Sequence, residues 1–501
     1  MAGQDDQIAG RVRRGLSWNL GGSIITNGVR VAVIVILGRA LDSRDFGIVA
    51  AALSVNAVLY SIRDVGVGLA LIQRKEILPE HRATAFAVSG YIGLTLSLVI
   101  FLCAPLLAEL YRVPESQGVF QALGLIFAMR GFSTTSRMFC QRQMDFRRIA
   151  ITEVIGFTSG SVLSMVLAVL GAGPWALVCG YLFEEVIATF LFITAYPPVV
   201  TWRIDRQRLR ELMTFGTGQT VAQIAGVAAI HGDNLVVGNV LGPAVLGYYT
   251  RAYDLIKFPS TVFAAVVGDV LFPAFSKLQD DKPRLAAQCR RVTFVNALVL
   301  LPASTVLVVV APEAIRILMG KGWEPAVLPF QILAVTILMR TSQKLTSVVA
   351  SAANAVNSVA VAYVIYATFV VGGAAISVYW GIAGVAITTA IAITVSNIEC
   401  SYLALRVSGL RLRELLGAHV PGLVLALVVG AMAWPLAHAA REAKLSAAVI
   451  LVGVALLAIA LSLGIVAVWV RRGRGEFGWL RDELRRLRQR KRPAAQDLPQ
   501  S

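Results

Sequence analysis

About fourteen apolar stretches, each roughly 20 residues long and separated by short polar segments, limit what this chain can fold into. A helix of about 20 apolar residues crosses the roughly 30 Å hydrocarbon layer of a membrane. The chain is 57% hydrophobic and 15% charged, whereas soluble domains carry about 25% charged residues. Since no polar segment is long enough for a sizeable soluble domain, the sequence predicts an all-α membrane protein with about fourteen transmembrane helices.

The predicted helices fall into two groups of six and a final pair. The first six are expected at residues 16–37, 46–71, 83–107, 119–139, 149–170 and 174–196. The next six are expected at 212–237, 246–275, 292–310, 326–350, 358–379 and 382–405. The last two are expected at 417–437 and 447–470. This map divides the chain into an N-lobe (1–205), a C-lobe (206–410), two extra helices (411–470) and a basic tail (471–501).

The distribution of Lys and Arg predicts the orientation of this map. If the N-terminus is cytoplasmic, the inside segments hold 32 of the 46 basic residues and the outside loops hold 7. The other 7 lie within predicted helices. Such a bias follows the positive-inside rule, so both termini are expected in the cytoplasm, with the chain in a bacterial inner membrane. The net charge of +17 is explained by this placement, and no nucleic acid partner is expected.

The remaining composition gives little support to other chemistry. The five Cys show no paired spacing, and the four His form no cluster, so neither a metal site nor any cofactor is predicted. In the tail, Phe477, Leu480, Leu484 and Leu487 recur at helical spacing among arginines. This pattern predicts an amphipathic helix on anionic membrane lipids, with a solvated charged tail as the alternative.

The two groups of six helices share short sequence features at an offset of 200 residues. Gly38, Leu41 and Gly47 recur as Gly238, Leu241 and Gly247 at the junctions of the first and second and of the seventh and eighth helices. Glycine is common in this chain, so chance is the alternative. Six helices per repeat would give both lobes the same orientation, and two such lobes commonly hold a substrate between them.

Several ionisable residues interrupt the apolar stretches. A charged side chain near the middle of a membrane costs at least about 2.5 kcal/mol, so it usually faces a partner or a wet cavity. For any single basic residue, a structural salt bridge is the simpler explanation. For the set, the sequence predicts a shared cationic cavity, because Arg binds phosphate oxygens in a forked geometry. The predicted members are Arg30, Arg63, Arg130, Arg251, Arg340 and Lys344.

Buried acids suggest a second role. A carboxylate inside a membrane can carry a proton or bind sodium, and Asp233 and Glu184 lie within predicted helices. They are the candidates for ion coupling. Pairing with a neighbouring Arg remains the alternative for each.

Several segments resemble the Wzx-type flippases, which form the polysaccharide transporter family of the multidrug/oligosaccharidyl-lipid/polysaccharide exporter superfamily. The resemblance extends from about residue 15 to 290, and loosely to 405. Its strongest part is Asp233-Asn-Leu-Val-Val-Gly-Asn-Val-Leu-Gly242 with the segment that follows it. The matching segments are 38–47, 64–74, 141–147, 233–242, 246–253 and 271–275.

This resemblance implies two six-helix lobes that flip an undecaprenyl-diphosphate-linked oligosaccharide, driven by a proton or sodium gradient, for exopolysaccharide or O-antigen (lipopolysaccharide) biosynthesis. It also implies a polysaccharide polymerase and export machinery as partners, and no enzymatic activity. A diphosphate lipid is the kind of anion that buried arginines would bind. Two alternatives stay open: a drug antiporter of the same superfamily, and, against the short outside loops, a membrane polymerase or ligase of lipid-linked sugars.

Overall fold

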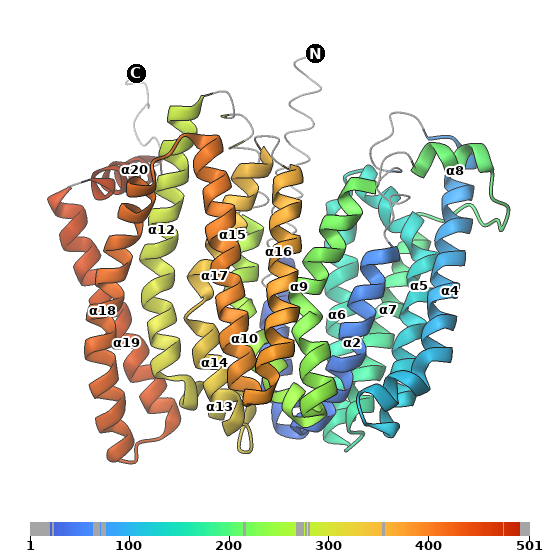
Figure 1. Cartoon of the computed structure of the whole chain (residues 1–501), viewed down its shortest axis with the longest axis horizontal. Helices are drawn as coiled ribbons and strands as arrows, with labels where there is room; N and C mark the ends of the chain where they lie inside the picture. The colour runs from blue at the N-terminus through green and yellow to red at the C-terminus, as the bar shows by residue number, and fades with distance from the viewer. Residues whose placement is uncertain are drawn as a thin grey trace, which may run out of the picture. The chain divides into compact units, whose positions relative to one another are not determined.

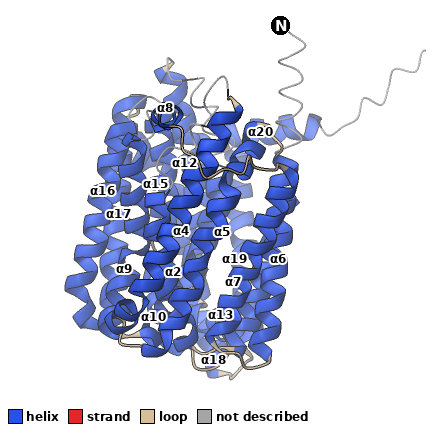
Figure 2. Ribbon diagram, turned by 90° about the vertical axis from the view of Figure 1, so that its right-hand side faces the viewer, coloured by secondary structure: helices blue, strands red, loops and turns tan. Residues whose placement is uncertain are grey.

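A computed structural model describes residues 21–490, except 23–24, 64–70, 72–76, 214–216, 267–274, 276–277, 279–280, 353–355 and 474. Over these residues the secondary structure is helical throughout, joined by loops and turns (Figure 2). The chain divides into two compact units. Unit 1 comprises Met1–Leu255, Ile315–Phe330 and Asn357–Ser396, and unit 2 comprises Ile256–Ala314, Gln331–Val356 and Asn397–Ser501.

The observed helices follow the predicted spans. Residues 25–40 are helical and correspond to the first predicted span. The helices of the first half are α2 (Ser43–Arg63), α4 (Pro79–Leu110), α5 (Gln117–Arg142), α6 (Phe146–Val169), α7 (Pro174–Ala195) and the short α8 (Arg206–Met213). Those of the second half are α9 (Thr217–Leu241), α10 (Pro243–Val266), α12 (Lys282–Val309), α13 (Ala311–Met319), α14 (Val327–Ala334), α15 (Ile337–Ala352), α16 (Val356–Ser377) and α17 (Gly381–Ser408). The last are α18 (Leu412–Glu442), α19 (Ala447–Arg472) and α20 (Glu476–Arg490), and Figure 1 labels these elements.

An all-α membrane fold is thus confirmed. Among the described residues, seven helical stretches are long and apolar enough to cross a membrane, or eight if a bent pair counts as one span. One stretch, Ser358–Ser408, is 51 residues long and is interrupted by the 3-10 turn η4 (Val378–Trp380) between α16 and α17. Since one crossing takes about 20 residues, this stretch has the length of two spans. The count of fourteen stays a prediction.

One predicted helix, 326–350, is bent in the structure. It is broken between α14 and α15 by 45°. At the break, the Ser304 hydroxyl donates to the Ala334 carbonyl, and the Thr336 hydroxyl donates to the Leu333 carbonyl. Side chains that insert into the backbone hydrogen-bond ladder bend helices in this way. The bend was not visible in the hydropathy pattern because Ser304 is distant in sequence.

The repeat at an offset of 200 has a direct structural counterpart in unit 1. A methyl group at Gly47 of α2 would overlap the carbonyl of Pro243, the first residue of α10. A methyl group at Gly247 of α10 would overlap the carbonyl of Ser43, the first residue of α2. Each glycine thus lets its helix approach the start of the other, and the two contacts are exchanged by the offset. This reciprocity supports a repeat rather than chance similarity.

Other matched turns agree with the repeat, although their offset is not constant. The 3-10 turn η1 (Pro114–Ser116) precedes α5, and η3 (Glu324–Ala326) precedes α14. Two residues before each turn, Arg112 and Gly322 both have positive φ. Gly173 and Gly381, also with positive φ, precede or begin α7 and α17. The lobe boundaries proposed from the sequence stay a prediction.

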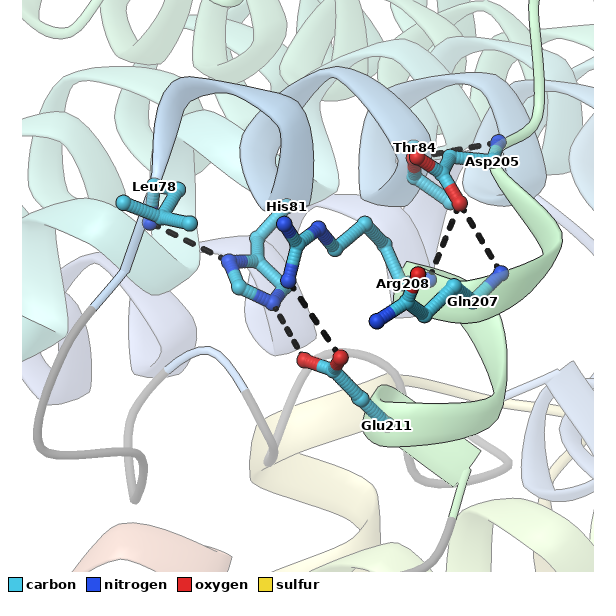
Figure 3. Close-up of polar contacts among 7 residues, drawn as sticks. All are labelled: Leu78, His81, Thr84, Asp205, Gln207, Arg208 and Glu211. Atoms are coloured by element: carbon cyan, nitrogen blue, oxygen red, sulfur yellow. Dashed lines mark hydrogen bonds and ion pairs between the residues drawn. The ribbon is translucent and has the colours of Figure 1, made fainter.

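The connection between α7 and α9 is held against α4 by the helix α8 (Figure 3). The Asp205 carboxylate accepts backbone N–H groups of Gln207 and Arg208, and so caps α8. At the start of α4, His81 Nδ1 accepts the Leu78 N–H, so the ring proton lies on Nε2 and is donated to Glu211 of α8 at 2.9 Å. These bonds fix the position of the connection within unit 1.

An aromatic anchor lies just before α8. The Trp202 ring packs edge-on against Tyr91 and Phe132, with ring centroids 5.2 and 6.1 Å away, and it contacts Phe86 at 6.2 Å. The Tyr91 hydroxyl also donates to the Trp202 carbonyl at 3.2 Å. The segment between the sixth and seventh predicted spans is therefore packed against α4 and α5 through Trp202, rather than being a loose linker.

Candidate functional site

A cavity of about 470 Å³ lies among the helices of unit 1. Its walls come from the first helix (residues 25–40), α2, α5, α6 and α7. Two predicted basic residues, Arg30 and Arg130, and one predicted acid, Glu184, line it together. The structure therefore brings three predicted site residues into one place. The charged groups in its lining are Arg30, Arg130, Arg137, Glu153, Glu184 and Glu185.

An ion pair dominates the centre of this cavity. Arg130 Nε of α5 lies 2.7 Å from Glu185 Oε2 of α7. The Arg130 guanidinium also lies over the Tyr60 ring of α2, 4.9 Å from its centroid. Glu185 is 8% exposed, so Arg130 is the cation that makes its burial tolerable. Sequence reasoning proposed Arg130 but missed Glu185 and Tyr60 as its partners.

Two further contacts extend the charged surface of the cavity. Arg137, about two turns beyond Arg130 on α5, contacts Glu153 of α6 at 2.8 Å. The Arg30 guanidinium lies over the Phe157 ring of α6, 5.6 Å from its centroid. With three basic and three acidic groups, the lining is balanced in formal charge rather than cationic. An anion that binds Arg130 or Arg137 here must compete with the carboxylate that already holds that arginine.

Glycines on α6 leave room for the two adjacent acids of α7, Glu184 and Glu185. A methyl group at Gly160 would collide with the Gly180 carbonyl and come within 2.8 Å of Glu184 Cβ. Gly156, one turn earlier, also approaches Glu184 closely. Close helix approach at glycine is common in membrane proteins. Here it places Glu184 and Glu185 against the cavity.

Arg251, another predicted cation, is not among the residues that line this cavity. Its guanidinium contacts Asp254 at 3.1 Å, one turn later on α10, and lies over the Phe46 ring at 4.5 Å. The Tyr181 hydroxyl of α7 lies within electrostatic range of Arg251, Asp254 and Glu184, and also of Arg30. Arg251 therefore belongs to unit 1, as the cavity does, but to a different set of contacts.

Two further predicted cations, Arg340 and Lys344 of α15, lie in unit 2. Lys344 interacts electrostatically with Arg340 and with Lys257. Arg340 is 7% exposed. Arg63 ends α2, and its side chain lies outside the described residues.

α15 also carries a polar run that sequence reasoning did not use. The Asn296 amide of α12 donates to the hydroxyls of Thr341 and Ser342 at 3.1 and 3.2 Å. The run combines a buried Arg with buried amide and hydroxyl groups, so this part of α15 is polar in the interior of unit 2. It was visible as a break in hydropathy within 326–350. Its buried members are Arg340, Thr341, Ser342, Gln343, Thr346 and Ser347.

The predicted ion-coupling residue Asp233 is fully enclosed in unit 1. It is 1% exposed. Its Oδ2 accepts the Tyr249 hydroxyl at 2.6 Å, and Thr389 of α17 lies 3.5 Å away. The Asn234 backbone N–H donates to Oδ1 at 2.9 Å. These oxygen-rich surroundings from α9, α10 and α17 suit a proton or a sodium ion.

Comparison with known proteins connects this chain to a family. The chain matches the family described as polysaccharide biosynthesis protein over residues 36–328, which is more than half of its length. It is 25% identical over 331 residues to the lipopolysaccharide biosynthesis protein WzxC of Escherichia coli (strain K12). It is 27% identical over 314 residues to the succinoglycan biosynthesis transport protein ExoT of Rhizobium meliloti (strain 1021). These alignments span 65% and 62% of this chain, and 67% and 63% of the relatives' own length.

Solved structures give the fold. The lipid II flippase MurJ, in an inward closed conformation, aligns with a TM-score of 0.71 at 12% identity, over 91% of this chain and 99% of that structure. An inward-facing multidrug resistance MATE transporter of the MOP superfamily aligns with a TM-score of 0.60 at 17% identity, over 77% and 95%. At such identity the likeness concerns the fold alone. The resemblance seen in the sequence is confirmed: this chain is a multi-pass membrane protein that belongs to the polysaccharide biosynthesis protein family.

Proposed function

We propose that this protein flips an undecaprenyl-diphosphate-linked oligosaccharide across the bacterial inner membrane for exopolysaccharide or O-antigen assembly. The observation that carries the proposal is the cavity around Arg130, in a chain whose relatives are named for lipopolysaccharide biosynthesis and succinoglycan transport. The lipid-linked sugar is its substrate, and a polymerase and export machinery are its partners. It needs no catalytic residue, because translocation makes and breaks no bond.

The Arg130–Glu185 pair suggests how the diphosphate is held and released. Unpaired phosphates in a low-dielectric interior cost many kcal/mol, so an arginine must meet them. Arg130 is already held by Glu185, so binding is an exchange of one anion for another. Such an exchange limits the affinity and lets the substrate leave on the far side. Arg30 and Arg251 supply further positive charge along the path.

We assign ion coupling to Asp233. The carboxylate has neutral hydrogen-bonding partners from three helices. Gaining a proton, or a sodium ion, would change the Tyr249 and Thr389 contacts and so the packing of α9, α10 and α17. Glu184, in the cavity of unit 1, is the second candidate.

A transport assay tests both assignments. Inverted membrane vesicles with the wild-type protein should move the lipid-linked oligosaccharide away from the exposed leaflet, measured by loss of lectin access. A proton or sodium ionophore should slow this movement. Asp233→Asn should remove the response to the ionophore and reduce movement about tenfold or more, because the amide cannot exchange the ion.

The control for this assay is Asn239→Gln, since Asn239 lies six residues after Asp233 on α9 but its amide donates to the Leu110 carbonyl of α4. It should keep the ionophore response. Equal lectin access with and without the wild-type protein would contradict the function. An unchanged response in Asp233→Asn would contradict only the coupling.

A small-molecule antiporter is the second candidate. The three acids in the cavity lining favour it, because cationic compounds would be drawn to carboxylates. Export of such compounds by vesicles that leave the lipid-linked sugar in place would support this alternative.

We also infer that both termini face the cytoplasm. This inference rests on the distribution of Lys and Arg. Of these residues, 32 lie in the predicted inside segments and 7 in the predicted outside loops. Reporter fusions after Ala195, Ser408 and Ser501 should all report a cytoplasmic location. A periplasmic signal at Ser501 would mean an odd number of spans.

A further inference from the structure

The C-terminal helix α20 does not continue α19. Gly473 ends α19 in the left-handed conformation (φ 60°, ψ 26°), which turns the chain. α20 then crosses the end of α19 and packs against α12 at Arg290 and Phe294, about two to three turns from the start of α12 (Figure 1). The Phe477 ring fixes it there, with centroids 5.0 Å from Phe294 of α12 and 5.2 Å from Trp469 of α19.

A cavity of about 810 Å³ lies beneath this crossing, entirely within unit 2. Its size is in the range of small-molecule sites. α12, α18, α19 and α20 all contribute to it. Its polar lining comprises Arg290, Arg291, Arg472, Glu414, Glu476 and the indoles of Trp469 and Trp479.

The three arginines that line this cavity differ in the groups that they contact. Arg290 Nε lies 2.6 Å from Glu476 Oε1, which ties α12 to α20. The Arg291 guanidinium lies over the Trp479 ring at 5.0 Å, and its buried Nε has no hydrogen-bond partner among the described residues. Arg472 ends α19 at an exposed position. Arg291 is thus positioned by stacking on an indole, and its Nε–H remains without an acceptor among the described residues.

We propose that this cavity binds the phosphate of an anionic phospholipid. α12, α18 and α19 have the length and composition of membrane spans, and α19 turns from apolar to basic at Arg471 and Arg472. The cavity therefore lies at the level of the headgroups. Arginine forks bind phosphate oxygens, and aromatic rings beside them are typical of the membrane interface.

The deeper surroundings favour a lipid over a free phosphate ion. Phe294, Val420 and Val424 line the same cavity. Leu298, one turn after Phe294, and Leu425, the residue after Val424, belong to a second hollow of about 580 Å³. Apart from Ser462, the residues that line this hollow are apolar. A ligand with a phosphate at one end and an acyl chain at the other fits both hollows.

Native mass spectrometry of the full-length protein with phosphatidylglycerol tests this inference. The wild type should retain the lipid, and Arg291→Gln with Arg472→Gln should retain it with about tenfold lower affinity, because two charge-assisted contacts are lost. Arg472→Gln alone, at an exposed position, should show part of the loss without affecting folding. The matched control, Arg411→Gln with Arg413→Gln, removes the same charge from exposed positions at the N-cap and in the first turn of α18, outside the cavity lining, and should bind like the wild type.

Three results would overturn the proposal. The first is equal retention of phosphatidylglycerol by all four proteins, and the second is an equal loss in the control, which would indicate attraction by charge alone. The third is displacement of the lipid by inorganic phosphate at the same concentration, which would assign the cavity to a free anion. None of these measurements depends on the transported substrate, so the inference and the proposed function fail separately.

Discussion

Cells that rely on an Arg130→Ala variant should export little or no polysaccharide. Arg130 is the arginine that meets both a buried acid and an aromatic ring in the cavity of unit 1. Its removal leaves Glu185 buried without a cation, at a cost of about 3 kcal/mol. Export should fall at least tenfold, and protein abundance should also fall.

A set of related variants separates transport from folding. Arg130→Gln combined with Glu185→Gln removes both charges, so it should restore abundance but not export. Arg130→Lys keeps the charge and loses the fork, so export should recover only in part. Replacing Arg316 or Lys444, which lie outside the cavity lining, by the other basic residue should have no effect. Normal export by the double variant at normal abundance would contradict a role for Arg130 in substrate binding.

Substituting alanine for Gly47 or Gly247 should destabilise the protein strongly and to a similar extent. In both positions a methyl group overlaps a backbone carbonyl of the other helix, Pro243 or Ser43. A flexible side chain could move aside, whereas a helix start cannot without moving the helix. Overpacking of this kind costs about 1–3 kcal/mol or more.

The measurement is the midpoint of thermal unfolding in detergent, followed by membrane abundance. Gly226→Ala is the matched control, because it is also a helical glycine and nothing lies within 4 Å of its added methyl group. It should be neutral or slightly stabilising. A large decrease in the unfolding midpoint for Gly47→Ala with no decrease for Gly247→Ala would mean that the two contacts are not equivalent.

The positions of the helices could be predicted from sequence because length and apolarity are local properties. The predicted span 447–470 is observed as α19, Ala447–Arg472, and the predicted span 174–196 as α7, Pro174–Ala195. Helix ends were less accurate, as for α12, which begins at Lys282 rather than at 292. A charged first turn belongs to the helix but not to the apolar stretch, so hydropathy misses it.

The partners within the site could not be predicted in the same way. Arg30, Arg130 and Glu184 were proposed because charges are unusual in apolar stretches, and all three line one cavity. Which acid holds Arg130 depends on how α5 and α7 are rotated about their axes and which faces meet. Gly156 and Gly160 control that approach, and a single sequence does not give their packing partners. The balance of three bases by three acids was missed for the same reason.

The reciprocal contact between α2 and α10 has a mechanical consequence. Gly47 rests on the first residue of α10, and Gly247 rests on the first residue of α2. The same contact is made in both directions, so the two helices have equivalent roles in this crossing. Since each helix start fills the space beside the glycine of the other helix, neither helix can rotate about its own axis here without displacing its partner.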